Sequence, residues 1–313
     1  MLGELVNSRP IQRLKGIRQG GASFLVNKEW NGTRYEHSVG VMLLCRLLGA
    51  SLEEQIAGLL HDISHTAFSH VIDLVFEKEN EDYHEEIFHE VVEKSEIPMI
   101  LAKHGYDYQE VLGDDSRYNI LERPLPQLCA DRIDYTLRNR FKCGSCSFEE
   151  IQIFLNELTV VDKKLCLQTL QTAEWFVKMF YKEVIDFFLH PLNIYGYEML
   201  ANTLRIGFSE NVISKNDLLK TDDELLEKLQ QTKNKEVQLA LTKVFEQVEL
   251  SEDENNYDFQ RKLKKRLIDP FIYKCNQLLP ASEVSEEISE MNRQASKKAE
   301  RGVFIRIKQL QSA

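Results

Sequence analysis

The stretch Leu60-His61-Asp62-Ile63-Ser64-His65-Thr66-Ala67-Phe68-Ser69-His70 places three histidines and an aspartate within eleven residues. It follows a segment that opens with Ser51-Leu-Glu-Glu54, a capping-box sequence, and continues with apolar residues at helical spacing. Neighbouring residues on a helix point about 100° apart. His61 and Asp62 can therefore face one ion only where the helix ends or bends, with further ligands arriving from other elements.

Two other segments carry the same chemistry. His37 follows Arg34-Tyr-Glu at the start of an almost wholly apolar run, which predicts a buried helix, and Asp131-Arg-Ile-Asp134-Tyr135 sets carboxylates in a second helical pattern. Five of the eight histidines lie between residues 37 and 84. Any one of them alone is more often a structural residue than a ligand, but together they predict a site. Imidazole and carboxylate donors suit Mn, Fe, Zn, Ni or Mg, so we expect a divalent metal ion in an open site of the kind that metal-assisted hydrolysis needs.

Composition excludes several classes of protein. The 313 residues include 39 Lys and Arg against 50 Asp and Glu, a formal net charge of −11. A chain this acidic is a poor general binder of nucleic acid. No run approaches the about 18 apolar residues of a transmembrane helix, and the N-terminus does not resemble a secretory signal, so we expect no membrane partner. The six cysteines are sparse, which favours reduced thiols and a cytoplasmic location.

Helical periodicity dominates the chain and predicts an all-α fold class, with a few short strands near the C-terminus. The alternating run Val303-Phe-Ile-Arg-Ile-Lys308 is the clearest strand. A break near Glu210 divides the chain into an expected catalytic core, 1–209, and a smaller helical C-terminal region, 210–313, that ends in this strand. For the basic run Arg261-Lys-Leu-Lys-Lys-Arg266 we favour a solvated helix face over a patch that binds phosphate or another subunit.

Taken together, the motifs around His37, His61 and Asp131 resemble those of the HD-domain metal-dependent phosphohydrolases. Within that superfamily they are most similar to the deoxynucleoside triphosphate triphosphohydrolase branch, and the resemblance extends over residues 8–205. It implies a mostly helical HD-domain fold in which four residues hold the metal: His37, His61, Asp62 and Asp131. Asp134, the second aspartate of its motif, is not a ligand by this pattern.

The resemblance also implies roles for residues around the metal. It assigns four to catalysis, namely His65, His70, Asp73 and His84, and four to substrate binding, namely Gln19, Arg34, Arg132 and Tyr135. His65 would contact the phosphate under attack, and His70 would be the acid/base. Asp73 and His84 would orient His70 or relay its proton. The two arginines would neutralise phosphate oxygens, while the glutamine and the tyrosine would face the sugar.

The implied activity is that of an enzyme with a nucleotide substrate, converting a dNTP into a deoxynucleoside and triphosphate by attack of metal-bound water on the α-phosphate. Two alternatives stay open: an HD-domain phosphatase or phosphodiesterase acting on nucleoside monophosphates or cyclic nucleotides, and a nucleic-acid-binding nuclease. Gly20 and Asn139 depart from the branch pattern beside the sugar, which leaves the choice of sugar open. Relatives commonly assemble, so we expect a homo-oligomer.

Overall fold

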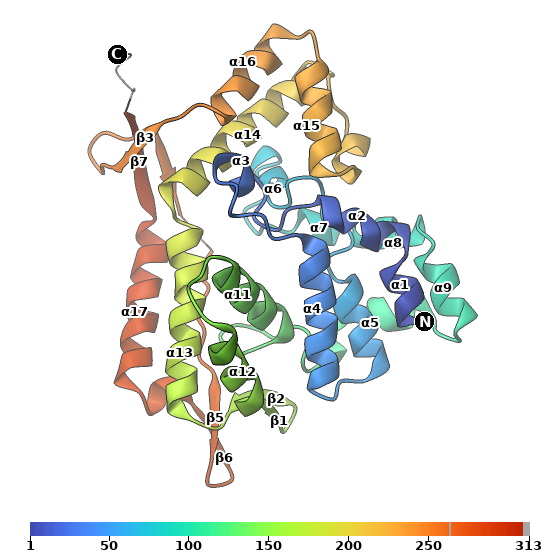
Figure 1. Cartoon of the computed structure of the whole chain (residues 1–313), viewed down its shortest axis with the longest axis vertical. Coiled ribbons are helices and arrows are strands. Elements are labelled where there is room, and N and C mark those ends of the chain that lie inside the picture. Colours follow the sequence, from blue (N-terminus) through green and yellow to red (C-terminus); the bar gives the residue numbers. More distant parts are fainter. Residues whose placement is uncertain (263, 309–313) are drawn as a thin grey trace.

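Three helices form the frame of the site: α4 (Arg34–Leu47), α5 (Leu52–Leu60) and α11 (Ala130–Lys142). The computed structural model describes residues 1–262 and 264–308. In it α4 packs against both α5 and α11 (Figure 1). Helix α4 begins with a complete capping box, in which the Thr33 side chain and Glu36 satisfy each other's backbone N–H groups. The predicted buried helix is therefore present, although Leu47 at its end is exposed.

The capping box predicted for α5 is only half formed. Ser51 accepts a hydrogen bond from the backbone N–H of Glu54, but the Glu54 carboxylate does not reach back. It is buried and accepts hydrogen bonds from the backbone N–H groups of Ile120 and Leu121, at 2.6 and 2.9 Å. The Ile120 carbonyl in turn accepts from the N–H of Ala130. These bonds tie the start of α11 to α5, which fixes where Asp131 lies.

The remaining helices cover this frame. On the N-terminal side they are α1 (Leu2–Val6), α2 (Arg9–Arg13), η1 (Leu14–Gly16), α3 (Ser23–Val26), α6 (Val71–Val75), α7 (Tyr83–Glu86), α8 (Phe88–Glu93), α9 (Ile97–Lys103), α10 (Tyr108–Leu112) and η2 (Asp115–Arg117). After α11 come α12 (Phe148–Glu157), α13 (Leu170–Tyr181), the π-helical turn η3 (Lys182–Phe187), α14 (Pro191–Ser209), η4 (Lys215–Leu219), α15 (Asp222–Gln231), α16 (Lys235–Val244), η5 (Ala281–Glu283) and α17 (Glu286–Arg301). Helix α17 runs beside α13 (Figure 1). No helix among the described residues is both long and apolar enough to span a bilayer.

In the described part of the chain, seven short strands form two sheets, and not all of them lie near the C-terminus. One sheet has the order β1 (Thr159–Val161), β2 (Lys164–Leu167), β5 (Phe271–Lys274), β6 (Gln277–Pro280). The expectation of strands only near the C-terminus is therefore wrong for β1 and β2, although the mostly helical class is confirmed. Asp162 and Lys163 have φ values of 48° and 61°. They form the two-residue turn of the hairpin between β1 and β2, directly after the β-branched pair Val160 and Val161.

The second sheet has the order β3 (Glu249–Glu252), β7 (Val303–Lys308), β4 (Phe259–Arg261). Strand β7 confirms the strand predicted at the C-terminal end of the described chain. Gly302 precedes it with a φ of 70°, and a Cβ there would lie 2.1 Å from the Arg261 carbonyl oxygen. Only glycine fits this approach, which brings the start of β7 against the end of β4.

The helix face expected for the basic run 261–266 is wrong. Arg261 ends β4, and the described residues 264–270 form neither helix nor strand. Leu263 lies outside the described residues. Strand β5, which follows this irregular segment, joins the first sheet by pairing in parallel with β2. The predicted boundary at 209/210 falls at the end of α14, and the division into two regions stays a prediction.

Candidate active site

Four side chains converge where α4, α5 and α11 meet. His37 lies on α4, His61 and Asp62 follow the last turn of α5, and Asp131 is in the first turn of α11. His37 Nε2 lies 3.0 Å from Asp131 Oδ1, 3.3 Å from His61 Nε2 and 3.7 Å from Asp62 Oδ2. His61 Nε2 lies 3.5 Å from Asp62 Oδ1. The end of α5 thus lets two adjacent residues face one point, as the sequence predicts.

The hydrogen bonds of the two imidazoles show that this donor set fits a cation. His37 Nδ1 lies 2.9 Å from Asp134 Oδ2, and His61 Nδ1 lies 2.8 Å from the Gly58 carbonyl oxygen. A proton on each Nδ1 leaves the two Nε2 atoms facing each other and two carboxylates. Burial opposes protonation of His37, but hydrogen bonds to Asp131 and Asp134 outweigh it and raise the pKa of His37 to about 10. A divalent ion at Nε2 would neutralise the same carboxylates in place of that proton.

A second group of potential ligands is less suited to an ion. Glu122, Cys129 and Asp131 also bring one donor atom each close together. However, Arg132 pairs with Glu122, and its Nη1 lies 3.0 Å from Cys129 Sγ. A guanidinium therefore already pairs with two of these three potential ligands. Burial and the neighbouring Asp131 raise the pKa of Glu122 to about 7.

Asp134 positions His37 without facing the converging donors. Its Oδ2 accepts from His37 Nδ1 and from Arg138 Nε, and its Oδ1 accepts from Arg138 Nη2 at 2.6 Å. A carboxylate behind a ligating imidazole fixes the tautomer and the orientation of the ring. The sequence excluded Asp134 as a ligand, but it contained no signal for this supporting contact.

Three further histidines form a cluster beside the four donors. The His65 ring stacks on the His84 ring at 4.0 Å, and the His70 ring lies edge-on to both. His65 Nε2 lies 3.1 Å from Asp62 Oδ1. Burial first, and then the positive charge of Arg34, lowers the pKa of His65 well below its usual range. Burial and the nearby His70 lower the pKa of His84 to about 3. Both rings are therefore neutral near pH 7.

Asp73 connects this cluster to the helix that carries His84. Its Oδ2 lies 3.0 Å from His70 Nδ1, and its Oδ1 accepts from the backbone N–H of Tyr83 at 3.0 Å. Tyr83 is the first residue of α7, so the same carboxylate orients one histidine and anchors the helix of the next. His84 is half-buried in this cluster.

The two predicted phosphate-binding arginines are both paired with carboxylates. Arg34 Nη1 donates to Asp62 Oδ2 at 2.8 Å, and its Nε donates to Ser69 Oγ at 3.1 Å. Ser69 reaches this position because it has a φ of 48°, which is uncommon for a non-glycine residue. Arg132 forms an ion pair with Glu122. Arg34 therefore contacts a candidate metal ligand directly, whereas Arg132 contacts the second group of potential ligands, formed by Glu122, Cys129 and Asp131.

The residues predicted to face the sugar lie at another part of the site. Gln19 Oε1 is buried and has no hydrogen-bond partner among the residues that the structure describes. The Tyr135 ring lies 6.5 Å from the His37 ring. Asn139 Nδ2 donates to Glu183 Oε1 at 2.9 Å, and Glu183 is fully buried in a contact with Arg140 at 2.7 Å. Glu183 was missed by the sequence analysis, because it stands in an aromatic-rich helix that reads as core.

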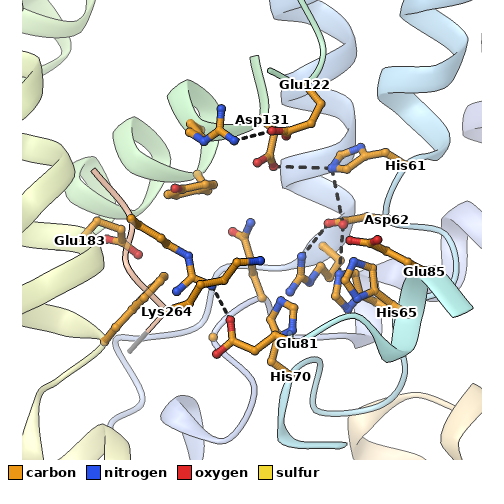
Figure 2. A pocket seen from close by; sticks show the side chains of 18 of the residues that line it. His61, Asp62, His65, His70, Glu81, Glu85, Glu122, Asp131, Glu183 and Lys264 are labelled. Atoms are coloured by element: carbon orange, nitrogen blue, oxygen red, sulfur yellow. Dashed lines mark hydrogen bonds and ion pairs between the residues drawn. The ribbon is translucent and has the colours of Figure 1, made fainter. Parts of the chain in front are cut away.

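One cavity of about 670 Å³ brings these groups together (Figure 2). All of the predicted site residues line it except His37 and Asp73, which lie behind the residues that they contact. The cavity also has lining residues that the sequence analysis did not assign: Glu81, Glu183, Asn193, Arg261, Lys264 and Arg266. The last three come from the C-terminal region, more than a hundred residues beyond Asp131. This arrangement is that of a hydrolytic metal centre with room for a small organic substrate.

Comparison with known proteins identifies the family of this hydrolase. An HD-domain family model matches residues 34–139. The chain is 32% identical over 289 residues to the metal-dependent phosphohydrolase cns2 of Cordyceps militaris, a match that spans 90% of this chain and 83% of that protein. The chain belongs to the HD-domain metal-dependent phosphohydrolases, and its cofactor is a divalent metal ion.

Other relatives are similar over different lengths. The uncharacterized protein YdhJ of Bacillus subtilis is 55% identical over 307 residues, which are 98% of this chain and 94% of that protein. A phosphohydrolase structure from Bacteroides thetaiotaomicron has a TM-score of 0.72 at 19% identity and covers 99% of this chain and 96% of that chain, which shows the shared fold. The deoxynucleoside triphosphate triphosphohydrolase SAMHD1 of Danio rerio is 30% identical over 135 residues, 36% of this chain and 22% of that protein.

Proposed function

We propose that the chain hydrolyses nucleotides, with a dNTP as substrate and a deoxynucleoside and triphosphate as products. The observation that carries the proposal is the position of Arg34 and His65 directly beside the candidate ligand Asp62, with His70 packed against His65, inside a cavity of nucleotide size. The motif resemblance and the partial similarity to SAMHD1 support the choice of a dNTP.

The proposed mechanism follows from the groups around the phosphate. His37, His61, Asp62 and Asp131 would hold a divalent ion, which would supply Lewis-acid chemistry to water and to a phosphoryl oxygen. Arg34 adds positive charge next to Asp62, where negative charge develops on the phosphate. Neutral His65 offers a hydrogen bond to the same region without adding a competing cation.

His70 is the proposed proton donor to the leaving oxygen. Its ring is partly exposed to the cavity, and its Nδ1 faces Asp73 at 3.0 Å. With a proton on Nδ1 donated to this carboxylate, Nε2 is the atom that holds and releases the transferred proton. His84 packs edge-on against the His70 ring and restricts its rotation.

A second candidate, hydrolysis of a nucleoside monophosphate or cyclic nucleotide, is favoured by the charges of the cavity. Its lining contains seven carboxylates, namely Asp62, Glu81, Glu85, Glu122, Asp131, Glu183 and Glu198. It contains five lysines and arginines, namely Arg34, Arg132, Arg261, Lys264 and Arg266. A divalent ion would offset the excess of two carboxylates, and a lining without net positive charge suits a monophosphate better than a triphosphate. A nuclease is disfavoured by the same balance and by the net charge of −11.

A product assay tests the proposal. The purified protein, with Mn²⁺ or Mg²⁺, is incubated with the four dNTPs, the NTPs, and panels of nucleoside monophosphates and cyclic nucleotides, and products are separated by ion-exchange chromatography. Triphosphate plus nucleoside supports the dNTP reaction. Release of phosphate from monophosphates alone replaces it with the second candidate, and no reaction on any nucleotide overturns the proposal. The double variant His61→Ala, Asp62→Ala controls for contaminating activity.

Homo-oligomerisation and a cytoplasmic location stay predictions. Light scattering on the purified protein measures the first, and fractionation of cells that express the chain measures the second.

A further inference from the structure

The basic run of the C-terminal region supplies part of the cavity wall. Arg261, Lys264 and Arg266 line the cavity that also contains Asp62 and His70, and Figure 2 shows Lys264 among the side chains that surround it. Lys265, between two of them in sequence, does not line the cavity and pairs instead with Glu300 at 3.1 Å. Neighbouring positions of one segment therefore separate into those that face the cavity and one that faces away.

Lys264 differs from every other cation of the cavity in its contacts. Four of the five lysines and arginines that line it have a carboxylate partner within 4.0 Å: Arg34 with Asp62, Arg132 with Glu122, Arg261 with Glu198, and Arg266 with Glu81. Among the side chains that the structure describes, which do not include that of Asp115, no carboxylate pairs with Lys264. A lysine that faces a carboxylate-rich cavity without a partner is available to an anion that enters it.

The flanking arginines hold the segment that carries this lysine. Arg266 pairs with Glu81 and lies over the Phe188 ring at 5.6 Å. Arg261 lies 3.6 Å from Glu198, a residue of α14. These two anchors hold Arg261 and Arg266 against different elements. Lys264, which is itself exposed, lies between the two anchored positions in sequence.

From this arrangement we infer that Lys264 binds the phosphate groups of the substrate that are not attacked, so that the C-terminal region forms a subsite for an oligophosphate tail. This inference rests on the proposed function, because it assumes that the attacked phosphate lies beside the metal ligands. A tail extending from there into the cavity would pass Glu81 and Glu198, whose carboxylates are already paired with Arg266 and Arg261. Lys264 is then the lining cation whose charge is still available to the tail.

Binding of inorganic tripolyphosphate tests this subsite without requiring any hydrolysis. The protein as purified, in excess Mg²⁺ so that the probe does not remove its metal, is titrated by calorimetry with tripolyphosphate and separately with inorganic phosphate. Wild type is compared with Lys264→Ala and with the matched control Lys265→Ala, which removes the same charge outside the cavity. Thermal melting shows whether each variant is folded.

We expect Lys264→Ala to weaken tripolyphosphate binding about tenfold, the loss typical of one charged hydrogen bond. Lys265→Ala should change it less than twofold, and neither variant should change binding of inorganic phosphate. Equal effects of the two variants on tripolyphosphate, or no binding of tripolyphosphate to wild type, would overturn the inference. If nucleotides are not hydrolysed but tripolyphosphate binding depends on Lys264, the proposed function fails and the subsite stands.

Discussion

Removing the Asp134 carboxylate should weaken metal binding although Asp134 is not a candidate ligand. Asp134 accepts from His37 Nδ1 at 2.9 Å, and His37 is only 1% exposed, so water cannot easily replace this acceptor. In Asp134→Ala the Nδ1–H group is left buried without its partner. In Asp134→Asn the side-chain oxygen can still accept, but the negative charge is lost.

The size of the two effects follows from these contacts. A buried donor without a partner costs about 1–3 kcal/mol of folding stability, in the metal-free and the metal-bound protein alike. Loss of a carboxylate behind a ligating imidazole typically costs about 10- to 100-fold in metal affinity. Because a hydrogen bond to a charged acceptor is roughly twice as strong as a neutral one, we expect Asp134→Asn to lose about half of that free energy.

Metal affinity is measured by competition with a chromophoric chelator, and circular dichroism checks the fold of each variant. Arg138→Ala is the matched control, because it removes the other partner of Asp134 and keeps the bond to His37. We expect it to change affinity by less than about threefold, since Arg138 is partly exposed and exposed ion pairs contribute little. Asp134→Ala with the affinity of wild type would refute the reasoning.

Three further predictions concern other parts of the site. Gly40→Ala should lower metal affinity with little loss of helix content, because its Cβ would lie 1.9 Å from Asp134 Oδ1 and displace that side chain; chelator competition measures this. His70→Ala should retain its metal and lose about 100-fold or more in turnover, measured by metal analysis and steady-state kinetics. Burial would raise the pKa of Glu81, but Arg266 outweighs it and lowers that pKa from 4.5 to about 2. The ion pair therefore stabilises the fold above pH 4.5, by about 3 kcal/mol at most. This stabilisation is lost as the pH falls through about 2. The melting temperature of Glu81→Gln should therefore differ from that of wild type more at pH 7 than at pH 3.

Local sequence patterns predicted the frame of the site because each pattern acts within one helix. Thr221-Asp-Asp-Glu224 forms the capping box that its sequence indicates. The pattern at Ser51 failed where tertiary contacts intervene, since the buried Glu54 carboxylate satisfies Ile120 and Leu121 instead. Propensity gives no information about such a distant pair of donors.

The candidate ligands and the histidine cluster could be found from sequence because their motifs are short and their spacing is distinctive. Glu183 could not be found in this way, and the run that contains Lys264 was considered as a phosphate-binding patch only as the less favoured alternative. Glu183 lies in a π-helical turn among aromatic residues, and Lys264 lies in an irregular segment of a basic run. Their shared position in the cavity depends on how the C-terminal region folds back onto the core, which no local pattern records.

The pairing of charges in the cavity indicates which cations are available to a substrate. Around the candidate ligands, Arg34 and His37 contact the carboxylates of Asp62 and Asp131. Elsewhere in the lining, Glu81 and Glu198 neutralise two arginines and leave Lys264 unmatched among the described side chains. An anionic substrate therefore gains most from contact with the metal and with Lys264, and less from the arginines, whose charge is already used. The distance between these two points, rather than the total number of basic residues, would then determine how many phosphates the preferred substrate carries.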